Sequence, residues 1–309
     1  MFGRRALFTM MAAFGAVAVS PAEADPRVRT FRVGPGPVVV AVNSRLGVTY
    51  VGNSDGSVSV ANGATVAVGG KPTDLAIDEV DGQVYAASKN AGTVTVLDPD
   101  GRLRSVVAGG PGAAVLDLDT TMNRLYVASG TTGSVAVIDT IAGTLTGLLR
   151  GPGKGFGGIR VDGQRQVAYL TNPAAGTVEV LDLGSGDFTA SIATGAGPSG
   201  LALHEASNTV YVANSGIHHL SVIDGASRTE RAKVILRSEA SSVVVHQASN
   251  TVYANGGPDG LVKIDGFAGK IVDQLSLGIN PGGMAIDQRT AAVCVTDPLH
   301  DQLYAIDGF

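Results

Sequence analysis

Short segments in which apolar residues alternate with small or polar ones recur along nearly the whole chain. In residues 70–112, for example, this period-two pattern predicts strands over 75–77, 84–87, 94–97 and 104–107. Turn-forming residues separate these segments, among them Asp81-Gly82 and Gly109-Gly110-Pro111. The stretch therefore reads as one antiparallel sheet of four short strands, whose first strand is the smallest and most aliphatic.

This four-stranded unit occurs seven times. The second strand of each unit starts with Tyr, except in the last unit, where Cys takes that place: Tyr50, Tyr85, Tyr126, Tyr169, Tyr211, Tyr253 and Cys294. The steps between these residues are 35, 41, 43, 42, 42 and 41. A period near 40 that is built from short strands and Gly/Pro turns is typical of a β-propeller. We expect an all-β, seven-bladed β-propeller of four-stranded blades that forms one domain over residues 25–309.

The two ends of the chain predict how the ring closes. The last repeat stops after its third strand, at residues 305–309, while an unassigned strand over 28–33 precedes the first inner strand at 38–42. Pairing of the N-terminal strand into the last blade would complete seven sheets and remove an open edge. We therefore expect residues 28–33 to supply the missing strand.

The N-terminus has the features of an export signal. Arg4 and Arg5 precede a short apolar stretch over 6–19, and Ala22-Glu23-Ala24 forms a small-x-small cleavage site. Residues 1–24 are therefore predicted to be a signal peptide, and the mature protein to be periplasmic or secreted with no stable membrane anchor. Because paired arginines also occur in twin-arginine signals, the sequence leaves the general secretory and twin-arginine routes open.

The repeat resembles a known family in its tyrosine-led strand, its Gly-rich turn and its Val-Ile-Asp ending. Tyr211-Val212-Ala213-Asn214 followed by Val222-Ile223-Asp224 shows the pattern well. It resembles the YVTN β-propeller repeat family, which includes periplasmic YncE-like proteins and archaeal surface-layer proteins. The resemblance covers residues 28–309 and weakens in the first, sixth and seventh repeats. It implies a non-enzymatic binding or scaffold protein of the cell envelope, and for some members single-stranded DNA binding.

Charge and composition argue against nucleic acid as the partner. Removal of residues 1–24 takes away Arg4, Arg5 and Glu23, and leaves 20 basic against 26 acidic side chains. The chain has no basic run, no Trp and 5% aromatic residues, whereas single-strand binding depends on cations and stacking platforms. Cys294 is the one cysteine, so we expect a buried hydrophobe and no disulfide.

The regularly repeated polar residues are expected to belong to the scaffold. One set closes the third strand of each repeat: Asn62, Asp98, Asp139, Asp182, Asp224, Asp265 and Asp307. A second set ends the inner strand: Asn43, Asp78, Asp119, Asp162, His204, His246 and Asp287. Short acceptors at such positions bond nearby backbone N–H groups, so both sets are interpreted as turn residues, the two histidines included.

Candidate functional residues are sought where the loops depart from the repeat. The loops into the inner strands and those between second and third strands share one face, here called the loop-rich face. Two inner-strand loops are unusual, 151–158 and 237–241. We expect Lys154, Phe156, Arg160, Arg237 and Glu239 to form the polar rim of a ligand pocket, with Asp74 as a further ligand-binding residue. The expected partner is a protein, peptide or small molecule of the envelope, and the protein is expected to be a monomer.

A second group of exceptions lies in the loops between second and third strands. His218, His219, Asp259, His300 and Asp301 fall on neighbouring repeats and offer a hypothetical divalent-metal site. No cofactor is otherwise predicted. The alternative function is a metal-dependent hydrolase or lyase that acts in the central funnel with Asp74 and Glu239. The chain contains neither a Gly-x-Ser-x-Gly nucleophile elbow nor a Cys-x-x-Cys-His haem motif.

Overall fold

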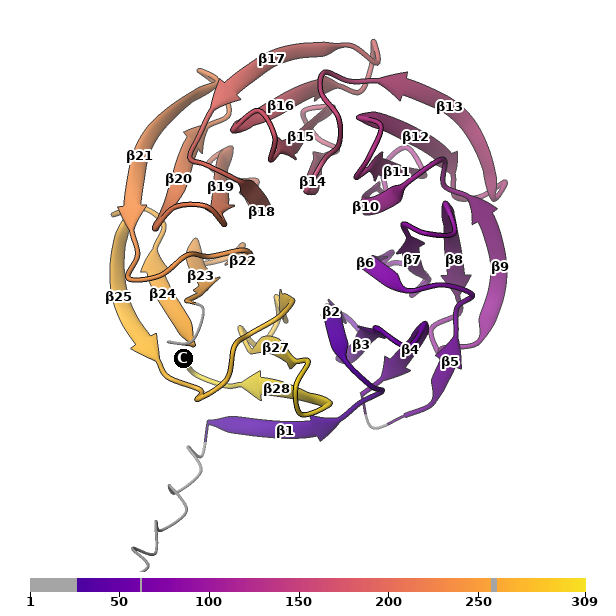
Figure 1. Cartoon of the computed structure of the whole chain (residues 1–309), viewed down its shortest axis with the longest axis horizontal. Helices are drawn as coiled ribbons and strands as arrows, with labels where there is room; N and C mark the ends of the chain where they lie inside the picture. Colours follow the sequence, from indigo (N-terminus) through magenta and orange to yellow (C-terminus); the bar gives the residue numbers. More distant parts are fainter. Residues whose placement is uncertain (1–26, 62, 257–259) are drawn as a thin grey trace, which may run out of the picture.

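The alternating segments fold into antiparallel strands that are grouped four at a time into seven sheets around a central axis (Figure 1). The computed structural model describes residues 27–61, 63–256 and 260–309. The prediction of an all-β, seven-bladed propeller is confirmed. The proposed signal peptide, 1–24, lies outside the described residues. No helix within the described residues is long and apolar enough to cross a membrane.

The first four blades are consecutive runs of strands. Blade 1 holds β2 (Pro37–Asn43), β3 (Val48–Asn53), β4 (Ser57–Val60) and β5 (Thr65–Ala67). Blade 2 holds β6 (Pro72–Ile77), β7 (Val84–Ser88), β8 (Thr93–Leu97) and β9 (Leu103–Ala108). Blade 3 holds β10 (Ala113–Asp119), β11 (Arg124–Ser129), β12 (Ser134–Asp139) and β13 (Thr144–Arg150). Blade 4 holds β14 (Gly158–Asp162), β15 (Val167–Asn172), β16 (Thr177–Asp182) and β17 (Phe188–Ala193).

The remaining blades follow the same order, except that the last takes its outer strand from the N-terminus. Blade 5 holds β18 (Pro198–His204), β19 (Thr209–Asn214), β20 (His219–Asp224) and β21 (Thr229–Ile235). Blade 6 holds β22 (Val243–His246), β23 (Thr251–Asn255), β24 (Leu261–Asp265) and β25 (Lys270–Leu275). Blade 7 holds β26 (Met284–Ile286), β27 (Val293–Asp297), β28 (Gln302–Ile306) and β1 (Val28–Arg32).

Ring closure occurs as the strand count predicts. β1 pairs antiparallel with β28, from Val28 opposite Ile306 to Arg32 opposite Gln302. The Arg29 guanidinium donates to both carboxylate oxygens of Asp307, at 2.7 and 2.9 Å. The pairing covers the edge that β28 would otherwise expose to solvent.

Apolar clusters between adjacent blades form the core, and the tyrosines of the repeat lie within them. Tyr50, Tyr126, Tyr169 and Tyr211 are among the largest fully buried side chains. At four seams the tyrosine hydroxyl donates to the next blade. The bonds are Tyr50 to Pro99 O (2.5 Å), Tyr169 to Asn208 Oδ1 (3.1 Å), Tyr211 to Gly266 O (3.0 Å) and Tyr253 to Phe309 O (2.8 Å). The ring of each of these four tyrosines thus fills the seam between two blades, and its hydroxyl stabilises the seam with a hydrogen bond.

The repeated polar residues serve the scaffold. The Asp224 carboxylate accepts the N–H groups of Ala226 and Ser227, and the same pattern recurs at Asp139 and Asp265. His204 and His246 link neighbouring blades, because their Nε2 atoms lie 2.9 and 3.1 Å from the carbonyl oxygens of Gln247 and Gln288. Cys294 is buried, and burial raises the pKa of its thiol to about 11.

Candidate functional site

The inner strands of the seven blades surround the central axis (Figure 1). Residues of these strands line a central channel with a volume of about 760 Å³. Its wall consists mostly of aliphatic and small residues from β2, β6, β10, β14, β18, β22 and β26. The charged residues that line it are Asp74, Glu79, Asp117, Arg160 and Glu205. Four carboxylates thus face one guanidinium, so the channel attracts cations.

Three of these residues come from consecutive inner strands, β6, β10 and β14, and lie close enough to interact electrostatically. Asp74 Oδ2 accepts the Leu116 N–H of the next blade at 3.0 Å, and Asp117 Oδ2 accepts the Val161 N–H at 2.7 Å. These N–H groups lie on strand edges that face the channel and have no neighbouring strand there. The two carboxylates therefore join blades 2, 3 and 4 while their remaining acceptor capacity faces the channel.

Burial perturbs both carboxylates. It raises the pKa of Asp74 to about 6, although the Arg160 guanidinium and the N–H groups of Leu116 and Leu75 oppose the shift. Burial likewise raises the pKa of Asp117 above its usual range, again opposed by Arg160. Arg160 itself donates to its neighbour's carbonyl, Ile159 O, at 2.7 Å. Carboxylates with raised pKa values inside a cavity are common at binding sites.

The raised pKa of Asp74 predicts a pH-dependent effect of Asp74→Asn. The folded protein binds a proton on Asp74 up to about pH 6, whereas the unfolded chain releases it near pH 4. Above pH 6 the ionised and buried Asp74 carboxylate therefore lowers the free energy of unfolding. The neutral side chain of Asn does not have this effect. We expect Asp74→Asn to raise the free energy of unfolding by about 1–2 kcal/mol at pH 7.5 and by little at pH 4. Urea denaturation at both pH values measures the difference.

Asp224→Asn provides a control of opposite sign. The backbone N–H of Ser227, followed in size by other bonds of the same turn, lowers the pKa of the Asp224 carboxyl. Its stabilising contribution is present at neutral pH and is lost as the pH falls. Asp224→Asn should therefore destabilise the protein at pH 7.5. An effect of Asp74→Asn that is equal at all pH values would contradict the assignment of a raised pKa.

A belt of hydrogen bonds runs around the end of the channel at which the inner strands finish. Each bond joins the backbone N–H of one blade to a side chain of the next. The bonds are Glu205 N to Gln247 Oε1, Gln247 N to Gln288 Oε1, Gln288 N to Ser44 Oγ and Ser44 N to Glu79 Oε1. The belt crosses the junction between the last and first blades. Glu79 and the two glutamines are thereby held in place as scaffold.

The loops expected to share the loop-rich face do so. Backbone hydrogen bonds connect the two loop sets within a blade, for example Ser54 N to Gly36 O and Ser215 N to Gly197 O. Lys154, Arg237 and Glu239 are exposed in these loops and are separate from the channel lining, which includes Asp74 and Arg160. The structure thus brings together only Asp74 and Arg160 of the six residues expected to form one pocket.

Phe156 requires a correction, because it is not part of a polar rim. Its side chain is 3% exposed and stacks on Phe188 of β17, with ring centroids 5.9 Å apart. The loop 151–158 folds inward at this point, so the aromatic ring extends the core between blades 3 and 4. Burial of its apolar surface stabilises the loop by roughly 2–3 kcal/mol.

The residues of the hypothetical metal site have other roles where the structure describes them. His219 is a buried residue of β20, not a loop residue, and burial lowers its pKa. His300 Nδ1 bonds Asp297 Oδ2 at 2.6 Å, and Asp301 Oδ1 accepts the Gly36 N–H at 2.7 Å. His218 is exposed, and Asp259 lies outside the described residues. Residues 27–61, 63–256 and 260–309 contain no group of three or more His, Cys, Asp or Glu placed to hold a metal ion.

Asp117 is the principal site residue that the sequence analysis missed. It lies two residues before Asp119, the last residue of its inner strand. Arg160 occupies the same position in the next blade, two residues before Asp162. The equivalent residues in the other blades are all apolar: Ala41, Ala76, Ala202, Val244 and Ala285. Departures from the repeat were sought in loops, whereas this one lies within a strand. Comparison of the inner strands position by position would have identified Asp117.

Comparisons with known proteins identify the fold and do not identify a family. No protein-family model and no curated protein matches the sequence. The solved structure of U3-55K superposes with a TM-score of 0.81 at 10% identity, over 91% of this chain and 98% of that chain. A chain of the Mitotic Checkpoint Complex crystal structure superposes with a TM-score of 0.79 at 15% identity, over 98% of this chain and all of that chain. With 1716 matching chains, the propeller supports many functions.

Proposed function

We propose that this chain is an exported, non-catalytic propeller that binds a protein or peptide partner on its loop-rich face, with a basic group of the partner entering the central channel. The propeller fold is consistent with a protein-binding scaffold. The export signal over 1–24 and the tyrosine-led repeat support a role in the cell envelope, like that of YVTN-type proteins. The observation that carries the proposal is the pair of carboxylates, Asp74 on β6 and Asp117 on β10, that line the channel beside one guanidinium, Arg160.

The charges in the channel explain why the entering group of the partner is expected to be a cation. At pH 7.5 Asp74 is ionised, because its pKa is raised only to about 6, and the nearby Arg160 guanidinium favours the ionised form of both Asp74 and Asp117. The channel holds these carboxylates within low-dielectric protein walls, which focus their field on an entering cation. A lysine side chain suits the site because it places an ammonium at the end of a flexible apolar stem.

A short lysine-rich peptide tests the proposal before the natural partner is identified. We expect a fluorescent oligolysine peptide to bind the mature protein at pH 7.5 and low salt, measured by fluorescence anisotropy. The double variant Asp74→Asn, Asp117→Asn should bind it roughly tenfold more weakly, a difference of about 1.4 kcal/mol. Added salt should weaken binding to the wild type more than binding to the variant.

A matched variant separates channel binding from attraction to the acidic surface. Asp182→Asn, Asp224→Asn removes the same number of charges from exposed turns, and both carboxylates there bond only local turn groups. This variant should keep the wild-type affinity. If the two double variants lose affinity equally, or if neither does, the peptide does not bind in the channel and the proposal fails. An envelope protein that is retained by the wild type and the turn variant, but lost with the channel variant, would identify the natural partner.

A further inference from the structure

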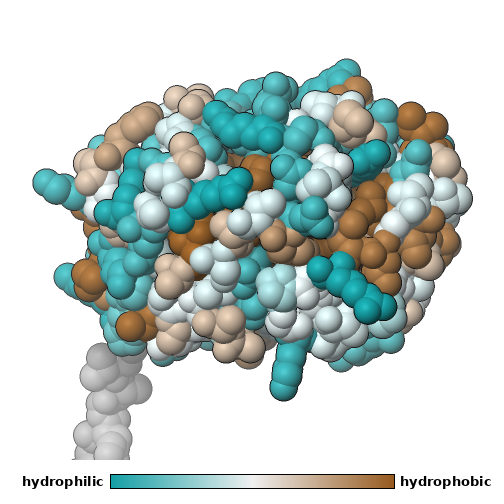
Figure 2. Space-filling view, turned by 90° about the horizontal axis from the view of Figure 1, so that it is seen from above, coloured by the Kyte–Doolittle hydropathy of each residue, from teal (hydrophilic) through white to brown (hydrophobic). Residues whose placement is uncertain are grey.

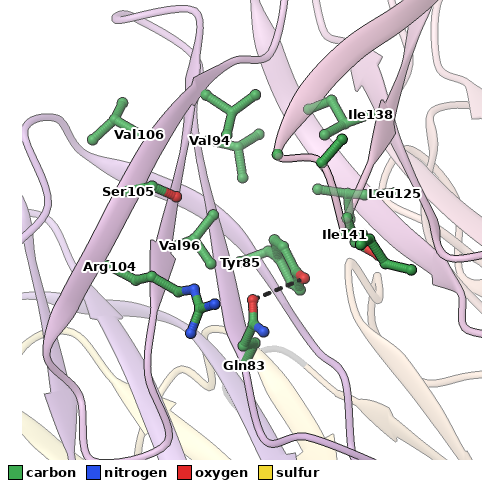
Figure 3. A pocket seen from close by; sticks show the side chains of 14 residues that line it. Gln83, Tyr85, Val94, Val96, Arg104, Ser105, Val106, Leu125, Ile138 and Ile141 are labelled. Atoms are coloured by element: carbon green, nitrogen blue, oxygen red, sulfur yellow. Dashed lines mark hydrogen bonds between the residues drawn. The ribbon is translucent and has the colours of Figure 1, made fainter.

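A second cavity, with a volume of about 320 Å³, opens at the seam between blades 2 and 3, away from the central channel. We call it the seam pocket. Strands β8 and β9 form one wall and Leu125 and Ile138 of blade 3 the other (Figure 3), and residues 140–143 also line the pocket. Its volume lies at the lower end of the range for small-molecule sites, about 300–1,000 Å³.

The deeper part of the seam pocket is aliphatic. Val94, Val96, Val107, Leu125 and Ile138 line it and also belong to the buried core between the two blades. At its mouth Val106 and Ile141 are 57% and 79% exposed. Figure 2 shows that apolar surface gathers toward one side of the rim, the side on which β9 and β13 lie in Figure 1. A ligand that covers this mouth would remove apolar surface from water.

The other end of the seam pocket is polar, and its tyrosine departs from the repeat. At four seams the tyrosine hydroxyl donates to the next blade. The Tyr85 hydroxyl donates to Gln83 Oε1 of its own blade, at the long distance of 3.3 Å (Figure 3). Hydrogen bonding with the side chain of Thr140 of blade 3 also acts on its pKa, and lowers it. Burial raises the pKa of Tyr85 to about 12, so the hydroxyl stays protonated.

The charges around this polar end are already paired within the protein. Arg104 Nη1 bonds Asp98 Oδ1 at 3.2 Å, and the Asp81 carboxylate accepts both the backbone and the side-chain N–H groups of Gln83, at 2.9 and 2.6 Å. The negative charge of Asp78 also raises the pKa of Tyr85. A ligand carboxylate would compete with Asp98 and be repelled by Asp81, whereas a ligand ammonium would face Arg104. The polar end is therefore best matched by a neutral group that both donates and accepts hydrogen bonds.

We propose that the seam pocket binds a small uncharged amphiphile, an aliphatic chain that ends in a hydroxyl group. The chain lies along Val94, Val96 and Ile138, and the hydroxyl bonds Tyr85 and Gln83. This site is independent of the partner-binding channel, since the two cavities have no lining residue in common.

Straight-chain alcohols of increasing length test the ligand class. Butanol, hexanol and octanol are titrated into the mature protein labelled at its Ile, Leu and Val methyl groups, and binding is followed by NMR. Affinity should rise about fourfold for each added methylene until the cavity is full. The methyl signals of Val96, Ile138 and Ile141 should shift. Octanoate and octylammonium should bind at least tenfold more weakly than octanol. Equal or tighter binding of either ion, no gain with chain length, or shifts located elsewhere would overturn the proposal.

Three variants locate the site. Tyr85→Phe removes only the hydroxyl and should weaken octanol binding about two- to tenfold. Tyr126→Phe makes the same change at the next seam, where the hydroxyl is buried, and should leave the affinity unchanged. Ser105, an exposed strand residue that pairs with Val96, lines the pocket, so Ser105→Phe should fill it and abolish binding. Circular dichroism verifies that each variant is folded. A folded Ser105→Phe variant with wild-type affinity would refute the site.

Discussion

A chain that starts at Gly34 should melt roughly 10–20 °C below one that starts at Arg27. The shorter chain lacks β1, so it loses the ladder with β28, the packing of Phe31 and the Arg29–Asp307 ion pair. Backbone hydrogen bonds at about 1 kcal/mol each and the three partly buried apolar side chains of Val28, Phe31 and Val33 together lose about 5 kcal/mol. Differential scanning calorimetry on the two chains measures the effect.

Single substitutions distinguish the contribution of the Arg29–Asp307 ion pair to stability from that of the strand itself. Arg29→Ala removes an exposed pair, and the two side chains are 57% and 46% exposed, so its effect should stay below about 1 kcal/mol. Phe31→Asp should reproduce part of the loss seen on truncation, since Phe31 packs against the apolar cluster of blade 7. Equal melting temperatures for the chains that start at Arg27 and Gly34 would show that β1 does not stabilise the ring.

The second large effect is expected at the crowded centre of the ring. A Cβ atom added to Gly200 would lie 2.6 Å from Ser241 O and 3.0 Å from Ser242 Cα of the next blade. The backbone of residues 241–242, which directly precede β22, cannot move away as a flexible side chain can. We therefore expect Gly200→Val to force β18 and β22 apart and to destabilise the protein by about 3 kcal/mol or more. Thermal denaturation should show a melting temperature lower by roughly 6–12 °C.

Ser242 provides the matched control for this steric effect. It occupies in blade 6 the position that Gly200 occupies in blade 5, four residues before the histidine that ends the inner strand. Because the structure already accommodates a Cβ atom there, Ser242→Val should change the melting temperature little. A loss as large as that of Gly200→Val would show that any bulky residue is excluded from this ring of positions, and that the close approach to Ser241 is not the cause.

The repeat allowed nearly all of the fold to be predicted. The Tyr-led strands, the Asp turns and the strand count at the two ends specify the blades, their number and their closure, because each feature depends on local chemistry that recurs. The strand bounds agree closely, as for the second strand of blade 2, predicted over 84–87 and observed as Val84–Ser88.

The site was harder to predict, and two residues show why. Phe156 lies in an irregular loop without periodicity, so the sequence does not reveal whether its ring faces solvent or, as the structure shows, stacks on Phe188. Asp117 alternates with leucines in a strand and reads as an ordinary solvent-facing residue. Asp117 lines a channel only because the seven blades close into a ring around it. Both errors arise because burial here depends on contacts between blades and not on local pattern.

The pairing of β1 with β28 also constrains when the protein can complete its fold. Arg29 and Asp307 are 278 positions apart, so β1 cannot pair until nearly all of the propeller has been made. Until then β28 is absent and β1 has no partner, and the growing arc of blades ends in an open edge that can pair with other chains. Contacts of such long sequence separation form slowly. An exported chain would thus have to be kept from associating with others during translocation, until β1 pairs with β28.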